Sequence, residues 1–286
     1  MRYEAPDSLQ VAVALLASAN GDARVLAGGT DLLVQMRADV VEPELIVDIK
    51  RIRETRAITE EQGGWRIGAA ATGAELKEHP RLKKVWPGVV EAANLIGSTQ
   101  VQGRATLGGN LCNGSPAADS VPALIAAAAV ATLAGPQGKR DLPVEDVMLG
   151  PRKLALKKGE ILVSFLLPPR PARSSDAYLR FIPRTEMDIA VVGAGVSLTL
   201  DGGGTVTAAR VSLGAVAARV LLVPEAAQAI IGSRLDAAAQ QRLEAAAQAA
   251  CRPIDDKRGT VEFRIQVAGV LARRAALIAL DRARSN

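Results

Sequence analysis

The first fifty residues alternate apolar runs with short polar breaks. Ser8, a residue type favoured at helix starts, precedes the first run, and Asn20 and Gly21 end it. We therefore expect, in order, a helix, a strand, a short helix and a second strand over residues 9–19, 23–29, 30–39 and 44–50. Strand, helix and strand at this spacing predict a small parallel unit that ends near residue 55.

The middle of the chain has a less regular pattern. Apolar runs predict three further strands, over residues 63–72, 129–135 and 160–168. Residues 83–97 predict a helix in spite of Pro87, and the glycine-rich residues 100–122 predict an irregular segment. Residues 168–175 contain three prolines and two serines, which resist regular structure, so this stretch is the best candidate for a linker.

The last third changes from strands to helices. Residues 188–216 predict successive strands around a glycine turn, which is the pattern of an antiparallel meander. Three helices are then expected, over residues 224–232, 235–252 and 260–284. The chain has no internal repeat, and its 286 residues are enough for two or three compact units.

Composition narrows the functional classes. The net charge of +5 is small and dispersed, and aromatic residues make up only 2% of the chain, so recognition of nucleic acid by base stacking is disfavoured. Cys112 and Cys251 are the only cysteines, too few for a metal or iron–sulfur site on their own and typical of a reducing compartment. We find neither a membrane-length apolar run nor an apolar export signal, and we expect a cytoplasmic protein.

Two adjacent glycines close the second predicted element. Gly28 and Gly29 follow a strand and precede Thr30, a candidate helix N-cap, with Asp31 in the first turn. Bare backbone amides at such a point can hold a phosphate. The segment matches neither the dinucleotide fingerprint nor the P-loop, so by itself a tight strand-to-helix turn is the simpler interpretation.

A second glycine-rich segment, over residues 105–120, favours a ligand. It offers many amides and hydroxyls and little apolar surface, and such a segment is costly to bury without a polar partner. A diphosphate with a ribose is a natural partner. Other candidates are weaker: His79 is the lone histidine and is expected at the surface, Cys112 is expected to line the ligand rather than react, and no G-x-S-x-G surrounds any serine.

Five segments together resemble the FAD-binding medium subunit of the molybdenum-containing hydroxylases, the family of carbon monoxide, xanthine and quinoline dehydrogenases. They are AGGTDLL (27–33), ATLGGNL (105–111), SPAADSVPAL (115–124), GEILVSFLLP (159–168) and MDIAVVGAG (187–195). Their order and spacing match the family over essentially the whole chain. The resemblance implies an α+β protein with the FAD-binding fold of the vanillyl-alcohol oxidase type. Two α/β subdomains, over 1–55 and 56–172, would precede a C-terminal domain of antiparallel sheet and helices over 173–286.

The resemblance also implies a set of FAD-binding positions. The first glycine turn and the second glycine loop would clasp the diphosphate, Asp119 would lie near the adenosine ribose, and Arg180, where many relatives have lysine, would reach the polar edge of the flavin. Asp31 is expected to cap its helix or meet a ribose hydroxyl, because a carboxylate repels phosphate. The full set is Val25, Leu26, Ala27, Gly28, Gly29, Thr30, Asp31, Leu32, Ile96, Gly97, Ala105, Thr106, Gly109, Asn110, Cys112, Asn113, Asp119, Ile161, Leu162, Arg180 and Ile189.

The implied role is electron transfer within a larger complex. A large subunit with the molybdenum cofactor would oxidise the substrate, and a small subunit with 2Fe–2S clusters would supply electrons to the FAD of this chain. The FAD would pass them to an external acceptor such as a quinone, NAD or oxygen. The family assembles as a dimer of heterotrimers. No side chain of this chain is assigned as a general acid, general base or metal ligand. Ile189 stands where some relatives place a tyrosine over the flavin, so the flavin would be less covered here. The alternatives are a self-sufficient flavin oxidase and a non-enzymatic nucleotide-binding assembly module.

Overall fold

The N-terminal part is a three-stranded parallel sheet with two helices. The computed structural model describes residues 1–286. Its first sheet has the strand order β1-β3-β2. The elements are β1 (Arg2–Glu4), α1 (Leu9–Ser18), β2 (Ala23–Leu26), α2 (Leu32–Arg37) and β3 (Leu45–Asp48). The predicted parallel strand–helix–strand unit is confirmed, because β2 and β3, which precede and follow α2 along the chain, pair with each other in parallel. Strand β1 was not predicted.

A five-stranded sheet forms the middle of the molecule, in the order β4-β5-β10-β6-β7. All its pairings are antiparallel. Its strands are β4 (Ile58–Glu61), β5 (Gly64–Gly68), β6 (Val130–Gly135), β7 (Gly138–Pro143) and β10 (Ile161–Leu167). A small hairpin, β8 (Met148–Gly150) and β9 (Lys153–Leu154), connects the edge of this sheet to β10.

Short helices cover this sheet, and they correct two predictions. They are α3 (Arg53–Arg56), α4 (Gly73–Glu78), α5 (Leu82–Val85), α6 (Pro87–Ala93), α7 (Thr99–Gln102), α8 (Leu107–Cys112), α9 (Ser120–Ala126) and the 3-10 turn η1 (Val144–Asp146). The helix predicted over 83–97 is present for the most part but is divided: α5 ends at Val85 and Pro87 begins α6, because proline lacks the N–H that a helix interior needs. The prediction of an irregular segment over 100–122 is wrong, since this segment contains α7, α8 and the start of α9.

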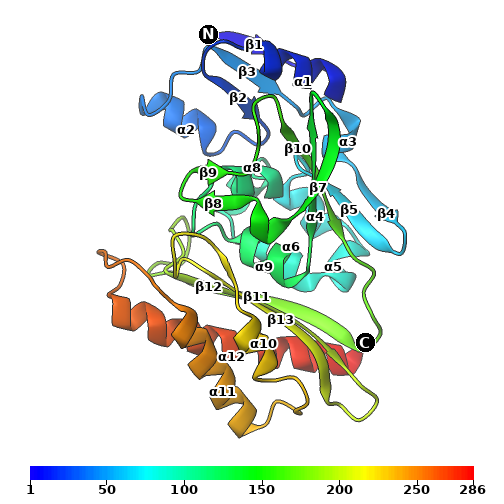
Figure 1. Cartoon of the computed structure of the whole chain (residues 1–286), viewed down its shortest axis with the longest axis vertical. Coiled ribbons are helices and arrows are strands. Elements are labelled where there is room, and N and C mark those ends of the chain that lie inside the picture. Colours follow the sequence, from blue (N-terminus) through cyan, green and yellow to red (C-terminus); the bar gives the residue numbers. More distant parts are fainter.

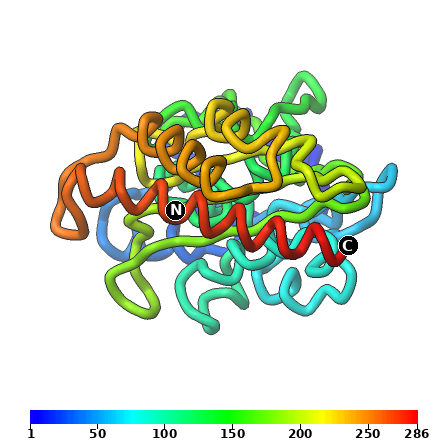
Figure 2. The backbone as a smooth tube through the Cα atoms, turned by 90° about the horizontal axis from the view of Figure 1, so that it is seen from below, coloured from blue at the N-terminus to red at the C-terminus, as the bar shows by residue number.

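The C-terminal part is an antiparallel sheet backed by helices, as predicted. The sheet runs β11 (Ser174–Phe181), β12 (Val192–Leu200), β13 (Val206–Gly214) and β14 (Leu221–Leu222), in that order. Helices α10 (Pro224–Gln228), α11 (Ala237–Ala250) and α12 (Val261–Ser285) follow. Strand β11 was not predicted, and it begins inside the candidate linker. Figure 2 shows α11 and α12, in orange and red, side by side on the outer face of this sheet.

The three parts lie one above another, with the N-terminal sheet at the top of Figure 1 and the C-terminal sheet at the bottom. The N-terminal hydrophobic core is shared with the middle sheet: Leu9 and Val47 belong to the same buried cluster as Ala134, Ile161 and Val163. The domain boundaries at residues 55 and 172 stay a prediction. None of the helices combines the length and the apolar character that a membrane crossing requires.

Candidate functional site

A cavity of about 530 Å³ opens between the N-terminal unit and the middle sheet. The wall is formed by β2 and α2, by α8 and the segment before it, and by the stretch from β9 to β10. These elements lie in the upper half of Figure 1. Most of the predicted FAD-binding residues line it. They are Val25, Ala27, Gly28, Gly29, Thr30, Asp31, Leu32, Ile96, Ala105, Thr106, Gly109, Asn110, Cys112, Asn113, Ile161 and Leu162.

The first glycine turn has room for backbone only. A Cβ added to Gly28 would lie 2.0 Å from the carbonyl oxygen of Arg104, so no side chain fits there. Gly29 has φ +81°, a conformation that L residues rarely adopt. The carbonyl of Ala27 accepts a hydrogen bond from Lys50 Nζ at 3.1 Å, and Lys50 in turn pairs with Asp48 at 2.7 Å. The turn is therefore fixed by close packing on one side and by a lysine tether on the other.

The second glycine segment is fixed by a helix cap. The Thr106 hydroxyl accepts a hydrogen bond from the Gly109 N–H at 3.0 Å and so starts α8. A Cβ on Gly108 would lie 2.5 Å from the carbonyl oxygen of Ala69, which brings α8 against the middle sheet. The Asn110 side-chain oxygen accepts from Ser120 N and Oγ at 3.1 and 2.7 Å. That oxygen is engaged at the start of α9.

A polar bridge joins the two glycine segments. The side-chain amide nitrogen of Asn113 donates to the Asp31 carboxylate at 3.2 Å, and Gln35 donates to the Asn113 side-chain oxygen at 3.0 Å. Of the two roles expected for Asp31, a cap on its helix is wrong, and contact with a ribose hydroxyl stays a prediction. Thr30 as the N-cap residue is wrong. Asp31 itself occupies the N-cap position of α2, but its α-helical backbone angles leave its side chain without a capping hydrogen bond. Nearby groups partly desolvate the exposed carboxyl and raise the pKa of Asp31.

Cys112 and His79, the candidates for covalent and acid–base chemistry, are not placed for these roles. Burial raises the pKa of the Cys112 thiol to about 12, so it is protonated at neutral pH and lines the cavity as a small neutral group. His79 is half-buried, stacks edge-on with Trp65 and accepts the Leu82 N–H at 3.1 Å through Nδ1. It lies outside the cavity lining.

Five predicted residues do not line the cavity: Leu26, Gly97, Asp119, Arg180 and Ile189. Leu26 and Gly97 are chain neighbours of lining residues. Asp119 and Arg180 form a buried ion pair at 2.7 Å, and Tyr178 donates to the same carboxyl at 3.0 Å. Burial raises the pKa of Asp119 to about 6, although Arg180 and Tyr178 act to lower it. Contact of this pair with a bound FAD stays a prediction.

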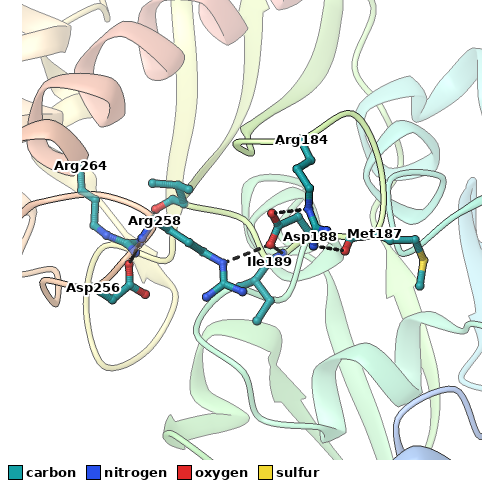
Figure 3. A network of polar contacts seen from close by, with 8 residues as sticks. Arg184, Met187, Asp188, Ile189, Asp256, Arg258 and Arg264 are labelled. Atoms are coloured by element: carbon teal, nitrogen blue, oxygen red, sulfur yellow. Dashed lines mark hydrogen bonds and ion pairs between the residues drawn. The ribbon is translucent and has the colours of Figure 1, made fainter.

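Ile189 lies on an exposed loop between β11 and β12, with 53% of its surface accessible. Its neighbour Asp188 accepts hydrogen bonds from Arg184 and Arg258, each at 3.1 Å (Figure 3). The bond from the Ile189 N–H and the bond from Arg258 lower the pKa of Asp188. This loop is therefore tied to the segment before α12, and the position of Ile189 over a flavin stays a prediction.

Two family models cover nearly the whole chain. The FAD-binding domain of molybdopterin dehydrogenases matches residues 1–170, and the CO dehydrogenase flavoprotein C-terminal domain matches residues 177–279. The chain belongs to the FAD-binding subunits of the molybdenum hydroxylases. It is 34% identical to the carbon monoxide dehydrogenase medium chain of Hydrogenophaga pseudoflava, over 96% of this chain and 94% of the relative. It is 32% identical to a putative xanthine dehydrogenase FAD-binding subunit of Escherichia coli, over 95% and 93%.

The solved structures agree with this assignment to the FAD-binding subunits. A chain of the reconstituted CO dehydrogenase from Oligotropha carboxidovorans matches with a TM-score of 0.94 and 35% identity, over 99% of this chain and 98% of that chain. The fold prediction is confirmed.

The cavity of this FAD-binding subunit fits its cofactor. Its volume lies within the range of roughly 300–1,000 Å³ that cofactor sites occupy. The backbone at Gly28, Gly29 and Gly109 can approach a diphosphate closely, because no Cβ projects from these residues, and at Gly28 none could be accommodated. The chain has no group of three or more His, Cys, Asp or Glu side chains placed to hold a metal ion.

Sequence reasoning missed several residues of the lining, and most of them lie outside the two glycine segments. They are Ala23, Arg24, Gln35, Val40, Val41, Ile49, Ala69, Gly108, Arg152, Leu154, Leu156 and Glu160. Gly108 is the exception, since it lies within the quoted motif ATLGGNL. Gln35 had a possible signal, because it follows Asp31 by one helical turn and so lies on the same face of α2.

Proposed function

We propose that this chain binds one FAD in the cavity and works as the FAD-binding subunit of a heteromeric molybdenum hydroxylase. Electrons would come from 2Fe–2S clusters on a small partner subunit, and a large partner subunit would hold the molybdenum cofactor and oxidise the substrate. The observation that carries the proposal is that two glycine segments, about eighty residues apart along the chain, face one cavity and are bridged by Asp31 and Asn113.

The residues of this chain would bind and orient the cofactor. Backbone N–H groups at Gly28 and Gly29 would donate to the diphosphate, and Gly109, which has no side chain, would leave room for it. Ile161 and Leu162 would supply apolar contact from β10. FAD, when bound, supplies electron transfer in single and paired steps. The buried Asp119–Arg180 pair would orient the cofactor from beyond the cavity wall. No side chain is needed as a general acid or base for this role.

The assembly is part of the same proposal. A dimer of heterotrimers, an external acceptor such as a quinone, NAD or oxygen, and a cytoplasmic setting are consistent with the family and with two free cysteines. The proposed units, 1–55, 56–172 and 173–286, are supported by the separate sheets of the N-terminal, middle and C-terminal parts.

Co-purification with metal analysis tests the proposal. The tagged chain, expressed with its native neighbours, should elute with a large and a small subunit, and the complex should contain FAD, iron and molybdenum. The chain alone should bind FAD but should not oxidise any small organic substrate. Turnover of an organic substrate by the isolated chain would favour the self-sufficient oxidase, and absence of FAD would favour an assembly module.

A further inference from the structure

Only two basic side chains line the cavity, Arg24 and Arg152. Arg24 is engaged in an ion pair with Asp22 at 2.9 Å. Arg152 is exposed and its side chain makes no ion pair or hydrogen bond within the chain. The lining therefore contains one cation without an internal partner.

The backbone holds Arg152 in a demanding conformation. Its φ is +58°, in the left-handed region that non-glycine residues rarely adopt. The Arg152 N–H donates to the Gly114 carbonyl at 2.9 Å, and a Cβ on Gly114 would lie 2.8 Å from the Arg152 Cα. Strained backbone of this kind persists where the surroundings fix it, and it is concentrated at functional sites.

This contact places Arg152 where the two glycine segments meet. Gly114 follows Asn113, whose side chain bridges to Asp31. Arg152 thus lines the same cavity as the Asp31 carboxylate, which would repel an anionic ligand. Glu160, the other acidic residue of the lining, is already paired with Arg140 at 2.8 Å. Of the charges that line the cavity, Asp31 and Arg152 alone have no ion-pair partner of opposite sign.

We propose that Arg152 binds the diphosphate of the cofactor and makes the cavity selective for FAD over flavins without phosphate. This inference rests on the proposed function. A guanidinium offers several N–H donors in a planar arrangement that matches phosphate oxygens, and its charge offsets that of Asp31. The glycine turns then supply close approach and Arg152 supplies the charge.

The test measures binding of three ligands to the full apo-chain: FAD, ADP and riboflavin. Arg152→Gln removes the charge and keeps much of the length, Arg152→Lys keeps the charge, and Arg173→Gln is the control. Arg173 also has a left-handed backbone, with φ +54°, and lies outside the cavity lining. We expect Arg152→Gln to weaken FAD and ADP binding about tenfold or more, the usual effect of losing a hydrogen bond to a charged group. Riboflavin binding should stay within about twofold of wild type, since that ligand lacks the phosphates.

Arg152→Lys should keep most of the FAD affinity, and Arg173→Gln all of it. If Arg152→Gln and Arg152→Lys both bind FAD as tightly as wild type, the inference is overturned while the proposed function stands. Equal losses for riboflavin and FAD would also overturn it, because they would place the guanidinium at the flavin. Failure of the wild-type chain to bind FAD would refute the proposed function itself.

Discussion

The Asn113 side chain donates a hydrogen bond to the Asp31 carboxylate at 3.2 Å, across 82 residues of sequence. Gln35 completes the bridge by donating to Asn113 at 3.0 Å. These contacts hold α2 against the end of α8, with the cavity behind them. The bridge therefore couples the two segments that would bind the cofactor.

Asn113→Ala should loosen this bridge. Because the contacts are partly exposed, we expect the free energy of FAD binding to weaken by about 1 kcal/mol, which corresponds to a roughly fivefold faster dissociation of FAD. Stopped-flow displacement of bound FAD measures the rate. Asn20→Ala, at an exposed loop, is the control and should leave it unchanged. A rate equal to wild type in Asn113→Ala would show that the bridge does not hold the two segments around the cofactor.

Gly28→Ala should remove the cofactor. The added methyl group would lie 2.0 Å from the Arg104 carbonyl oxygen, so the turn must move. We expect a destabilisation of about 1–3 kcal/mol, typical of overpacking, together with loss of FAD from the purified chain. Absorbance and thermal melting measure both effects. Gly202→Ala is the matched control, because an added Cβ there meets nothing within 4 Å. Full FAD content in Gly28→Ala would contradict the close approach inferred at this turn.

Lys50→Met should weaken FAD binding without touching the ligand. Lys50 Nζ donates to the Ala27 carbonyl and to Asp48, which also accepts the Tyr3 hydroxyl hydrogen bond at 2.6 Å. We expect a three- to tenfold weaker affinity, roughly the net contribution of one hydrogen bond. Lys50→Arg should restore part of it. Lys84→Met, on an exposed face of α5, is the control. An unchanged FAD affinity in Lys50→Met would show that the hydrogen bond from Lys50 to the Ala27 carbonyl does not hold the first glycine turn in its binding conformation.

Asp119 should make stability depend on pH. Burial raises the pKa of Asp119 to about 6, and the same carboxyl titrates near ~3.9 in an unfolded chain. Between these values the folded state binds the proton more tightly, so the free energy of unfolding falls as pH rises, by about 3 kcal/mol in total. Urea unfolding from pH 4 to pH 7 measures the free energy of unfolding of wild type and of Asp119→Asn. The difference between the two values isolates the contribution of Asp119. A difference that grows in favour of wild type with rising pH would mean that the Arg180 ion pair outweighs burial.

The elements that the sequence predicted have long apolar runs or clear turns. Strands β2, β3, β6 and β10 and the meander of β12 and β13 are of this kind. Strands β1, β4 and β7 were missed because they lie at sheet edges and carry polar residues, as in the sequence ITEE of β4. Helices α7 and α8 are too short to show a helical period, and their residues are mostly polar or glycine.

The residues of the site also fall into those that the sequence could predict and those that it could not. The two glycine segments could be found because their residues are contiguous and their composition is unusual. Arg152 and Ala69 could not, since they reach the cavity through tertiary packing against Gly114 and Gly108. Contact of Asp119 and Arg180 with the cofactor was implied by the resemblance and stays a prediction, while the ion pair between them was not foreseen. Which partner a charged side chain finds depends on contacts distant in sequence.

Titration of the purified apo-chain with FAD, followed by flavin fluorescence and absorbance, tests the central claim most directly. We expect saturation at one FAD per chain, with binding lost in Gly28→Ala and retained in Gly202→Ala. A wild-type chain that stays colourless and binds no FAD would contradict the assignment of the cavity as the cofactor site.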